Sequence, residues 1–122
     1  MKVGHIDQIK AKIYDDDCAK SLAKKILIGP NEGWSGWAMR IMEIKPGGYS
    51  PKHAHDWPHI NYFLSGQGIL MIDNEEHEVR TDSYAFVPAN VIHQFKNTSE
   101  DSLRFICIVP EHGEGDLKTA SR

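Results

Sequence analysis

The sequence predicts an all-β domain built as a sandwich or barrel of many short strands. Turn-forming combinations of glycine, proline, asparagine and aspartate recur at short intervals along the chain. The segments between them are rich in β-branched and aromatic residues, and helical periodicity is weak throughout. Frequent turns between such runs are typical of antiparallel sandwiches and barrels. The 122 residues are enough for one domain with a single hydrophobic core.

Eight strands are expected, each bounded by a turn signal. The turn signals are Gly29-Pro30, Pro46-Gly47-Gly48, Ser65-Gly66-Gln67-Gly68, Asp73-Asn74, Pro88-Ala89-Asn90 and Pro110. The expected strands are residues 26–28, 37–44, 59–64, 69–73, 77–81, 84–87, 92–96 and 103–109. The strongest helical segment, residues 17–25, is too polar for more than a turn or two.

Composition divides the chain into an arm, a barrel and a tail. Residues 1–22 are expected to form an N-terminal arm, in which Ile6, Ile9 and Ile13 dock on another surface. Residues 23–110 form the single barrel domain, and residues 111–122 form a polar C-terminal tail that frays. In a barrel this small the docking surface would belong to a second subunit, so a homodimer is expected.

Charge and cysteine content narrow the partners and the compartment. The net charge of −3 gives no basic field for nucleic acid or for anionic lipid. No N-terminal apolar run suggests a signal peptide or a membrane span. Cys18 and Cys107 lie far apart, and we interpret them as reduced thiols of a cytoplasmic protein. The expected partner is a small molecule.

The segment HAHDWPH concentrates three of the seven histidines within seven residues. On a strand, His53 and His55 point to the same face, and Pro58 disfavours a helix. A strand, a turn and a second strand that opens at His59 would form a hairpin that returns the third imidazole. His93, which begins a later strand, is the fourth candidate.

Four neutral imidazoles from two regions of a sheet suit one divalent transition metal, at about 2.0–2.2 Å each. A surface cluster that binds metal only opportunistically remains an alternative interpretation of the spacing. His5, His77 and His112 stand singly among polar neighbours and are not expected to be ligands.

Two motifs resemble those of the cupin family. The first, GGYSPKHAHDWPHINYFLSG, places Gly47, His53, His55, His59 and Gly66 at the family spacing, and the second is DSYAFVPANVIHQFKN. The second has Asp82, Pro88, Asn90, His93 and Asn97 at the matching positions, with Asp82 and Asn90 in place of glycines. Both residue types tolerate positive φ, so the turns are expected to survive.

The resemblance implies a double-stranded β-helix, or jelly-roll barrel, with a metal held by His53, His55, His59 and His93. His59 stands where the family usually has glutamate, so the site is similar to those of small four-histidine cupins.

An all-histidine site has distinct chemistry. Four neutral ligands leave the full +2 charge on the metal, which makes it a stronger Lewis acid and attracts anionic ligands. An octahedral ion would keep two open positions for a bidentate substrate. Mn, Fe, Co, Ni, Cu and Zn all accept imidazole, whereas Mg²⁺ and Ca²⁺ prefer oxygen ligands. Because the ligands must be neutral, metal should be lost as the pH falls towards and below about 6.

Strand alternation nominates the lining of the substrate pocket. The nominated residues are Met39, Ile41, Tyr49, Asn61, Phe63, Phe95, Phe105 and Cys107. This lining is mainly apolar. Neither Glu43 nor Asp56 is expected to face it, so the catalytic residues are unknown.

The sequence favours a metal-dependent oxidoreductase of the dioxygenase type that acts on a small bidentate oxygen-containing substrate. The apparent lack of a positioned acid and base disfavours proton shuttling. A non-redox Lewis-acid lyase, isomerase or cyclase and a non-catalytic binding protein remain alternatives.

Overall fold

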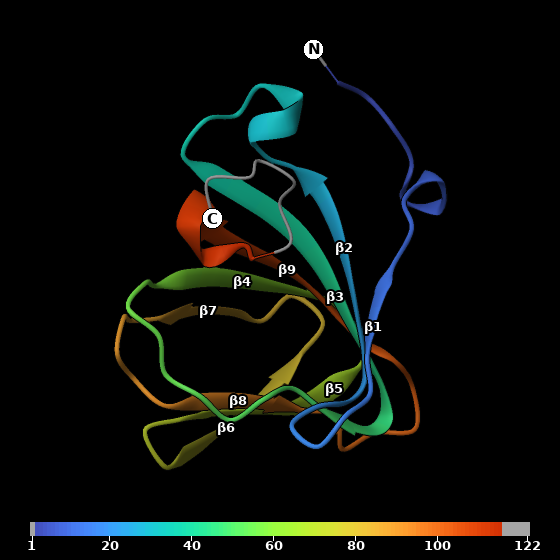
Figure 1. Ribbon diagram of the computed structural model, residues 1–122. Coiled ribbons are helices and arrows are strands. Elements are labelled where there is room, and N and C mark those ends of the chain that lie inside the picture. Colours follow the sequence, from blue (N-terminus) through green and yellow to red (C-terminus); the bar gives the residue numbers. More distant parts are fainter. Residues whose placement is uncertain (1, 116–122) are drawn as a thin grey trace.

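The computed structural model describes residues 2–115 and contains nine strands and three short 3₁₀ helices in that part of the chain (Figure 1). The strands are β1 Lys12–Tyr14, β2 Lys20–Ile28, β3 Trp37–Tyr49, β4 His59–Ser65, β5 Gln67–Ile72, β6 Glu75–Arg80, β7 Tyr84–Val87, β8 His93–Lys96 and β9 Leu103–Pro110. The 3₁₀ helices are η1 Ile6–Gln8, η2 Pro30–Glu32 and η3 Glu111–Gly113. None of the described helices is long and apolar enough to span a membrane.

The strands form one antiparallel sheet that curls into a nearly closed barrel (Figure 1). Its order is β6-β5-β8-β3-β9-β4-β7, with β2 paired to β3 and β1 to β2. Strands β3 and β9 pair over eight residues, from Trp37–Pro110 to Ile44–Leu103. This arrangement confirms the all-β jelly-roll fold expected from the sequence.

Two local expectations were wrong. Residues 17–25 form no helical turn of their own, because residues from Lys20 onward belong to β2 and pair with β3. The segment Pro46-Gly47-Gly48 does not end its strand, because β3 continues to Tyr49. Gly47 has a φ of 79°, and a Cβ on Gly48 would overlap the Lys20 carbonyl oxygen. The two glycines therefore let β3 bend while it stays paired.

The N-terminal segment packs against its own barrel. Lys25 Nζ donates to the Ile6 carbonyl oxygen at 3.0 Å, and Ile6, Ala11 and Ile41 line one small cavity on the outside of the sheet. Ile13, by contrast, is exposed. The surface that was expected to belong to a second subunit is thus partly supplied by this chain, and a homodimer stays a prediction.

The start of the C-terminal segment is ordered rather than frayed. Helix η3 follows β9, and the next residue, Glu114, is completely buried. The expectation of a frayed polar tail is therefore wrong for residues 111–115. Residues 116–122, which the same expectation covered, lie outside the described residues.

The hydrophobic core fills the closed end of the barrel beneath the histidine motif. Phe63, Phe95 and Phe105 pack ring on ring, with centroids 4.5–6.1 Å apart. Ile44, Leu70, Leu103 and other apolar side chains complete this cluster. The core thus anchors the strands that carry the candidate site.

Gly66 is expected to be intolerant of any side chain. It has a φ of 86°, and a Cβ would overlap the Ser102 carbonyl oxygen and lie 2.8 Å from Leu103 Cα. Gly66→Ala should therefore lower the free energy of unfolding by about 3 kcal/mol, because strain and a backbone clash add. Gly36→Ala is the matched control, with a φ of 94° but open space around it. It should cost about 1 kcal/mol. If urea denaturation shows the same loss of unfolding free energy for Gly66→Ala and Gly36→Ala, the backbone clash at Gly66 is contradicted.

Candidate metal centre

A backbone bridge brings His53, the first of the four candidate ligands, next to His93, the last of them. His53 N–H donates to the His93 carbonyl oxygen at 3.1 Å, and His93 N–H donates to that of His53 at 3.0 Å. Asn90 N–H donates to the His55 carbonyl oxygen at 2.7 Å, so the turn before β8 holds the same segment. The HAHDWPH segment is not the expected hairpin, because His53 pairs with β8 whereas β4, which begins at His59, pairs with β7 and β9.

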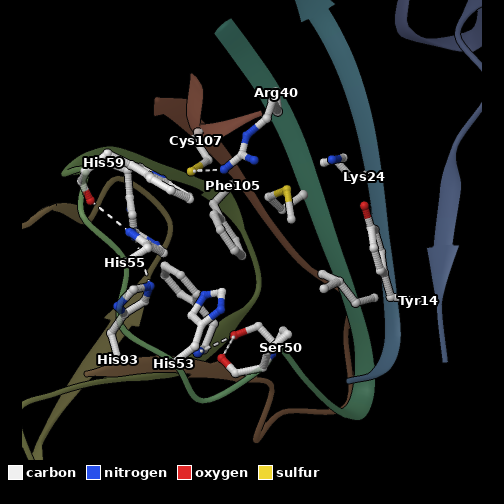
Figure 2. Close-up of a pocket in the computed structure, with 16 residues that line it drawn as sticks. Tyr14, Lys24, Arg40, Ser50, His53, His55, His59, His93, Phe105 and Cys107 are labelled. Carbon is white, nitrogen blue, oxygen red and sulfur yellow. Dashed lines mark hydrogen bonds between the residues drawn. The ribbon is translucent and has the colours of Figure 1, made fainter. Parts of the chain in front are cut away.

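The four histidine rings nevertheless converge on one side of a cavity of about 190 Å³ (Figure 2). His53, His55 and His93 each place a ring nitrogen so that the three atoms lie within 4.8 Å of one another. His59 Nε2 lies 3.1 Å from His93 Nε2. His59 and His93 are buried, with exposed fractions of 4% and 2%. The described residues therefore include a three-histidine group that could bind a metal ion, and a fourth imidazole beside it.

Hydrogen bonds to the outer ring nitrogens orient three of these imidazoles. His55 Nδ1 lies 2.8 Å from the Trp57 carbonyl oxygen, and His93 Nδ1 lies 2.9 Å from that of Val91. His59 Nδ1 lies 2.7 Å from Asn61 Oδ1. Asn61 Nδ2 itself donates to the Ile106 carbonyl oxygen, so its Oδ1 faces the ring. Carbonyl oxygens only accept, so each Nδ1 must carry the proton. In the neutral rings each Nε2 is then a bare lone pair, as metal ligation requires.

The contact between His59 and His93 tests whether these residues fit a metal. With both Nδ1 atoms protonated, the two neutral rings have no proton to share between their Nε2 atoms, and the lone pairs repel. Two nitrogens at about 2.1 Å from one ion and at a right angle would lie about 3.0 Å apart. The observed 3.1 Å matches that separation. A divalent cation would turn this repulsion into attraction, so the donor set fits a transition metal.

Loss of solvation favours the neutral form of the imidazoles. Desolvation, with smaller repulsion from the neighbouring histidines, lowers the pKa of His53, although its side chain is exposed, and of His93 to about 4. Desolvation also lowers the pKa of His59 to about 4, with a further contribution from the positive charge of Arg40. The pKa of His55 is lowered, chiefly by desolvation. His53, His59 and His93 are thus neutral well below pH 6, which moves the expected loss of metal to lower pH than the sequence suggested.

The metal-free protein should lose stability as the pH falls from 7 to 4. Each buried histidine binds its proton near pH 6.5 when unfolded and near pH 4 when folded. Between these values the unfolded state holds more protons, so the stability present above pH 6.5 declines as the pH drops. For each of His59 and His93 the loss should be on the order of 3 kcal/mol. Urea denaturation between pH 7 and 4 measures this loss of unfolding free energy. The control variant His77→Ala should show the same pH dependence as the wild type. A free energy of unfolding that does not change with pH would contradict the desolvation of these histidines.

The eight residues nominated for the substrate pocket differ in where the structure places them. Phe95, Phe105 and Cys107 line the cavity, in agreement with their strand alternation. Asn61 and Phe63 point inward but lie beneath the histidines, the first bonded to His59 and the second buried in the core. The remaining three, Met39, Ile41 and Tyr49, are absent from the cavity wall.

The placement of Met39 and Ile41 was wrong because β3 has apolar residues on both faces. Arg40 and Met42 line the cavity instead, while Ile41 faces the N-terminal segment on the outside. Tyr49 pairs with Lys20 and Lys96 at the end of the strand, and the following residues Ser50 and Pro51 reach the cavity.

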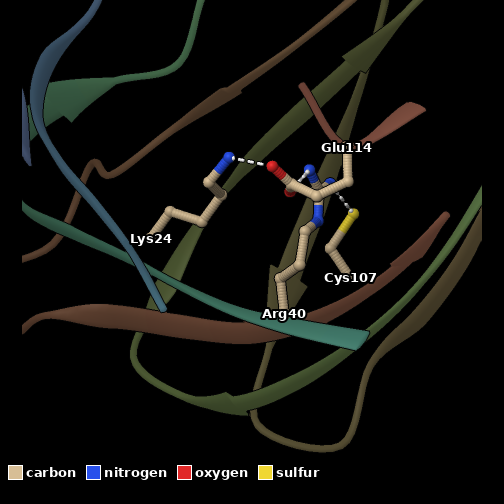
Figure 3. Close-up of polar contacts among 4 residues, drawn as sticks. All are labelled: Lys24, Arg40, Cys107 and Glu114. Carbon is tan, nitrogen blue, oxygen red and sulfur yellow. Dashed lines mark hydrogen bonds and ion pairs between the residues drawn. The ribbon is translucent and has the colours of Figure 1, made fainter. Parts of the chain in front are cut away.

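A group of charged side chains that was not predicted from the sequence lies at the opposite wall (Figure 3). Lys24 Nζ and Arg40 Nη1 donate to the two oxygens of Glu114 at 2.6 and 3.0 Å. Arg40 Nη2 lies 2.7 Å from Cys107 Sγ. Lys24 and Arg40 line the cavity with the histidines, and so does Tyr14 of β1. One feature of the sequence could have indicated the inward position of Lys24. Side chains alternate along β2, so Lys24 lies on the same face as the apolar Leu22, which also lines the cavity.

The aromatic rim of the cavity joins the two walls. Trp57 stacks on His55 with ring centroids 4.3 Å apart and planes 5° apart. A Cβ on Gly113 would lie 2.6 Å from the Trp57 indole nitrogen, so the C-terminal segment packs directly on this ring. The segment that supplies Glu114 thus also closes over the histidine side of the cavity.

Two curated relatives share part of this sequence. The chain is 29% identical over 90 residues to 1-methylthio-D-xylulose 5-phosphate methylsulfurylase from Rhodospirillum rubrum, which covers 74% of this chain and 56% of that protein. It is 31% identical over 48 residues to an uncharacterized protein from Methanocaldococcus jannaschii, which covers 39% of this chain and 38% of that one. The chain therefore spans about half the length, or less, of these relatives.

Solved structures show the same barrel. The polyketide cyclase RemF from Streptomyces resistomycificus superposes with a TM-score of 0.83 at 28% identity, over 90% of this chain and 79% of that one. A predicted oxalate decarboxylase from Thermotoga maritima superposes with a TM-score of 0.77 at 19% identity, over 89% and 98%. The family model described as the cupin domain matches residues 40–109, which is more than half of the chain. The chain belongs to the cupin family.

Proposed function

We propose that this cupin holds one divalent transition-metal ion with His53, His55, His59 and His93 and binds a small oxygen-containing substrate beside it. The observation that carries the proposal is the pair of bare Nε2 atoms of His59 and His93, 3.1 Å apart, with both Nδ1 atoms held by carbonyl oxygens. When bound, the metal would supply Lewis-acid polarisation of a carbonyl group. The histidines themselves orient that ion and keep their protons on the outer nitrogens.

The reaction that this site supports best is non-redox, of the cyclase, lyase or isomerase class. The sequence disfavoured isomerases that shuttle protons, because no acid or base was expected to face the pocket. Such groups line the cavity, since the Tyr14 hydroxyl and the Cys107 thiol belong to residues of its wall. Either can hold or move a proton at a substrate atom across from the histidines. The likeness to a polyketide cyclase at 28% identity supports the same class.

A metal-dependent dioxygenase is the second candidate, favoured by the apolar middle of the cavity. Phe95, Phe105 and Met42 lie between the two polar walls. Such a lining would shelter an oxygen-reactive substrate from water.

Proton exchange and oxygen uptake separate the two classes. Metal-loaded protein is incubated with hydroxyacetone in D₂O, and deuterium entry next to the carbonyl is followed by NMR. Oxygen consumption is followed in parallel with acetylacetone and catechol. We expect accelerated exchange, abolished in His93→Ala, and no oxygen consumption. Oxygen uptake that depends on catechol or acetylacetone, without accelerated exchange, would overturn the non-redox assignment in favour of the dioxygenase.

A further inference from the structure

The cavity has two polar ends of different character, separated by apolar side chains (Figure 2). The histidines lie at one end. Tyr14, Lys24 and Arg40, from β1, β2 and β3, lie at the other. Leu22, Met42 and Phe105 line the cavity as well, and Figure 2 shows Phe105 between the two ends. A ligand that fills this cavity must therefore satisfy two polar walls at once.

The second wall holds charged side chains in a buried setting. Lys24 and Arg40 have side-chain exposed fractions of 7% and 13%, and Glu114, which accepts from both, is at 0%. The Arg40 Nε atom is buried and has no hydrogen-bond partner among the described residues, although Arg40 lines the cavity. A buried donor without an acceptor is costly, and one on a guanidinium is best satisfied by an anionic acceptor, so this wall favours an anionic group.

The two ends belong to one cavity. Arg40 contacts Cys107, whose backbone pairs with that of Asn61, the residue that orients His59. Both ends line the same cavity of about 190 Å³, so one small molecule can contact both.

We propose that Lys24 and Arg40, with the Tyr14 hydroxyl beside them, bind a carboxylate or phosphate group of the substrate. Glu114 is the positioning residue that holds the two cations at the wall. The substrate class is then a small organic oxyanion with a chelating oxygen pair at one end, an apolar middle and the anionic group at the other. Only the chelating end rests on the proposed metal site, because the anionic end is held by side chains alone.

Two diketones that differ by one charge test the assignment. Acetylacetone and succinylacetone carry the same chelating group, and succinylacetone adds a carboxylate on a short flexible chain. Calorimetry on metal-loaded protein should show that succinylacetone binds about tenfold more tightly than acetylacetone, because a hydrogen-bonded charge contributes about that much. A parallel titration with propyl phosphate and propionate distinguishes a phosphate from a carboxylate preference.

Two variants that change the charge of the wall in opposite directions distinguish a role in binding from a purely structural role. Lys24→Met should remove the preference for succinylacetone, whereas Glu114→Gln, which removes the compensating negative charge, should increase it several-fold. Lys25→Met is the matched control, since this neighbour on β2 lies on the outer face and contacts Ile6. Its preference should equal that of the wild type. A structural role alone would leave the preference unchanged in all three, and that result would overturn the proposal.

The two proposals fail in different ways. If acetylacetone does not bind the metal-loaded protein, the proposed metal function fails, and succinylacetone is titrated into chelated protein. There Lys24→Met should still weaken binding and Glu114→Gln should still tighten it. If Glu114→Gln does not fold, the comparison of Lys24→Met with Lys25→Met decides alone. Equal affinities in those two variants would overturn the anionic subsite even where the metal site holds.

Discussion

His93→Ala should lower the affinity of the protein for a divalent transition metal by more than about 100-fold. The His93 ring lies near all three others, with centroids 5.0 Å from His53, 4.8 Å from His55 and 4.8 Å from His59. Its backbone also forms the bridge that holds His53 in place. That bridge needs no side chain, so alanine removes one ligand without releasing the segment of the first two histidines.

Equilibrium dialysis against Zn²⁺ or Mn²⁺ measures this loss. His77→Ala is the matched control, because His77 lies on β6 at an exposed position away from the cavity. His53→Ala should behave like His93→Ala, and His77→Ala like the wild type. If all three variants bind metal equally, the histidine cluster is not the metal site.

Glu114→Ala should lower the free energy of unfolding by about 3 kcal/mol or more. The substitution leaves Lys24 and Arg40 buried without the carboxylate that accepts from both, and breaking a buried ion pair typically costs this much. It also releases the C-terminal segment that packs on Trp57. Among the described ion pairs this is the one with the most deeply buried partners, which explains why the expected cost is so large.

The double variant Arg40→Met/Glu114→Ala identifies the cause. Removing the Arg40 cation as well should recover roughly half of the loss, because the flexible Lys24 side chain can bend towards solvent more easily than the Arg40 guanidinium. Urea denaturation in a buffer without phosphate or carboxylate measures both variants. A Glu114→Ala protein within about 1 kcal/mol of the wild type would show that the network contributes little to stability.

Local alternation predicted much of the site because it depends on backbone geometry alone. His93 and Phe95 share a face of β8, and Phe105 and Cys107 share a face of β9, as their spacing indicated. The same rule failed for Met39 and Ile41, because β3 has apolar residues on both faces and the N-terminal segment packs near Ile41 on the outer one. Hydrophobicity then no longer indicates which face is inside.

The parts that sequence could not predict depend on contacts between distant segments. The bridge between His53 and His93 joins residues 40 positions apart, and no local turn signal reports it. Glu114 lies in a polar stretch whose sequence is typical of a solvated tail. Its burial depends on Lys24 and Arg40, which are 90 and 74 positions earlier. A charged residue is predicted to be exposed unless the partners that would compensate its charge are known.

The metal content of the purified protein tests the central claim most directly. The protein is produced without added metal and without nickel affinity chromatography, and its transition metals are counted by elemental analysis. The proposed four-histidine site, which adds His59 to the group of His53, His55 and His93, predicts about one ion of Mn, Fe, Co, Ni, Cu or Zn per chain, lost in His93→Ala and retained in His77→Ala. A wild-type protein that contains no transition metal, and takes up none when one is supplied, would contradict the account.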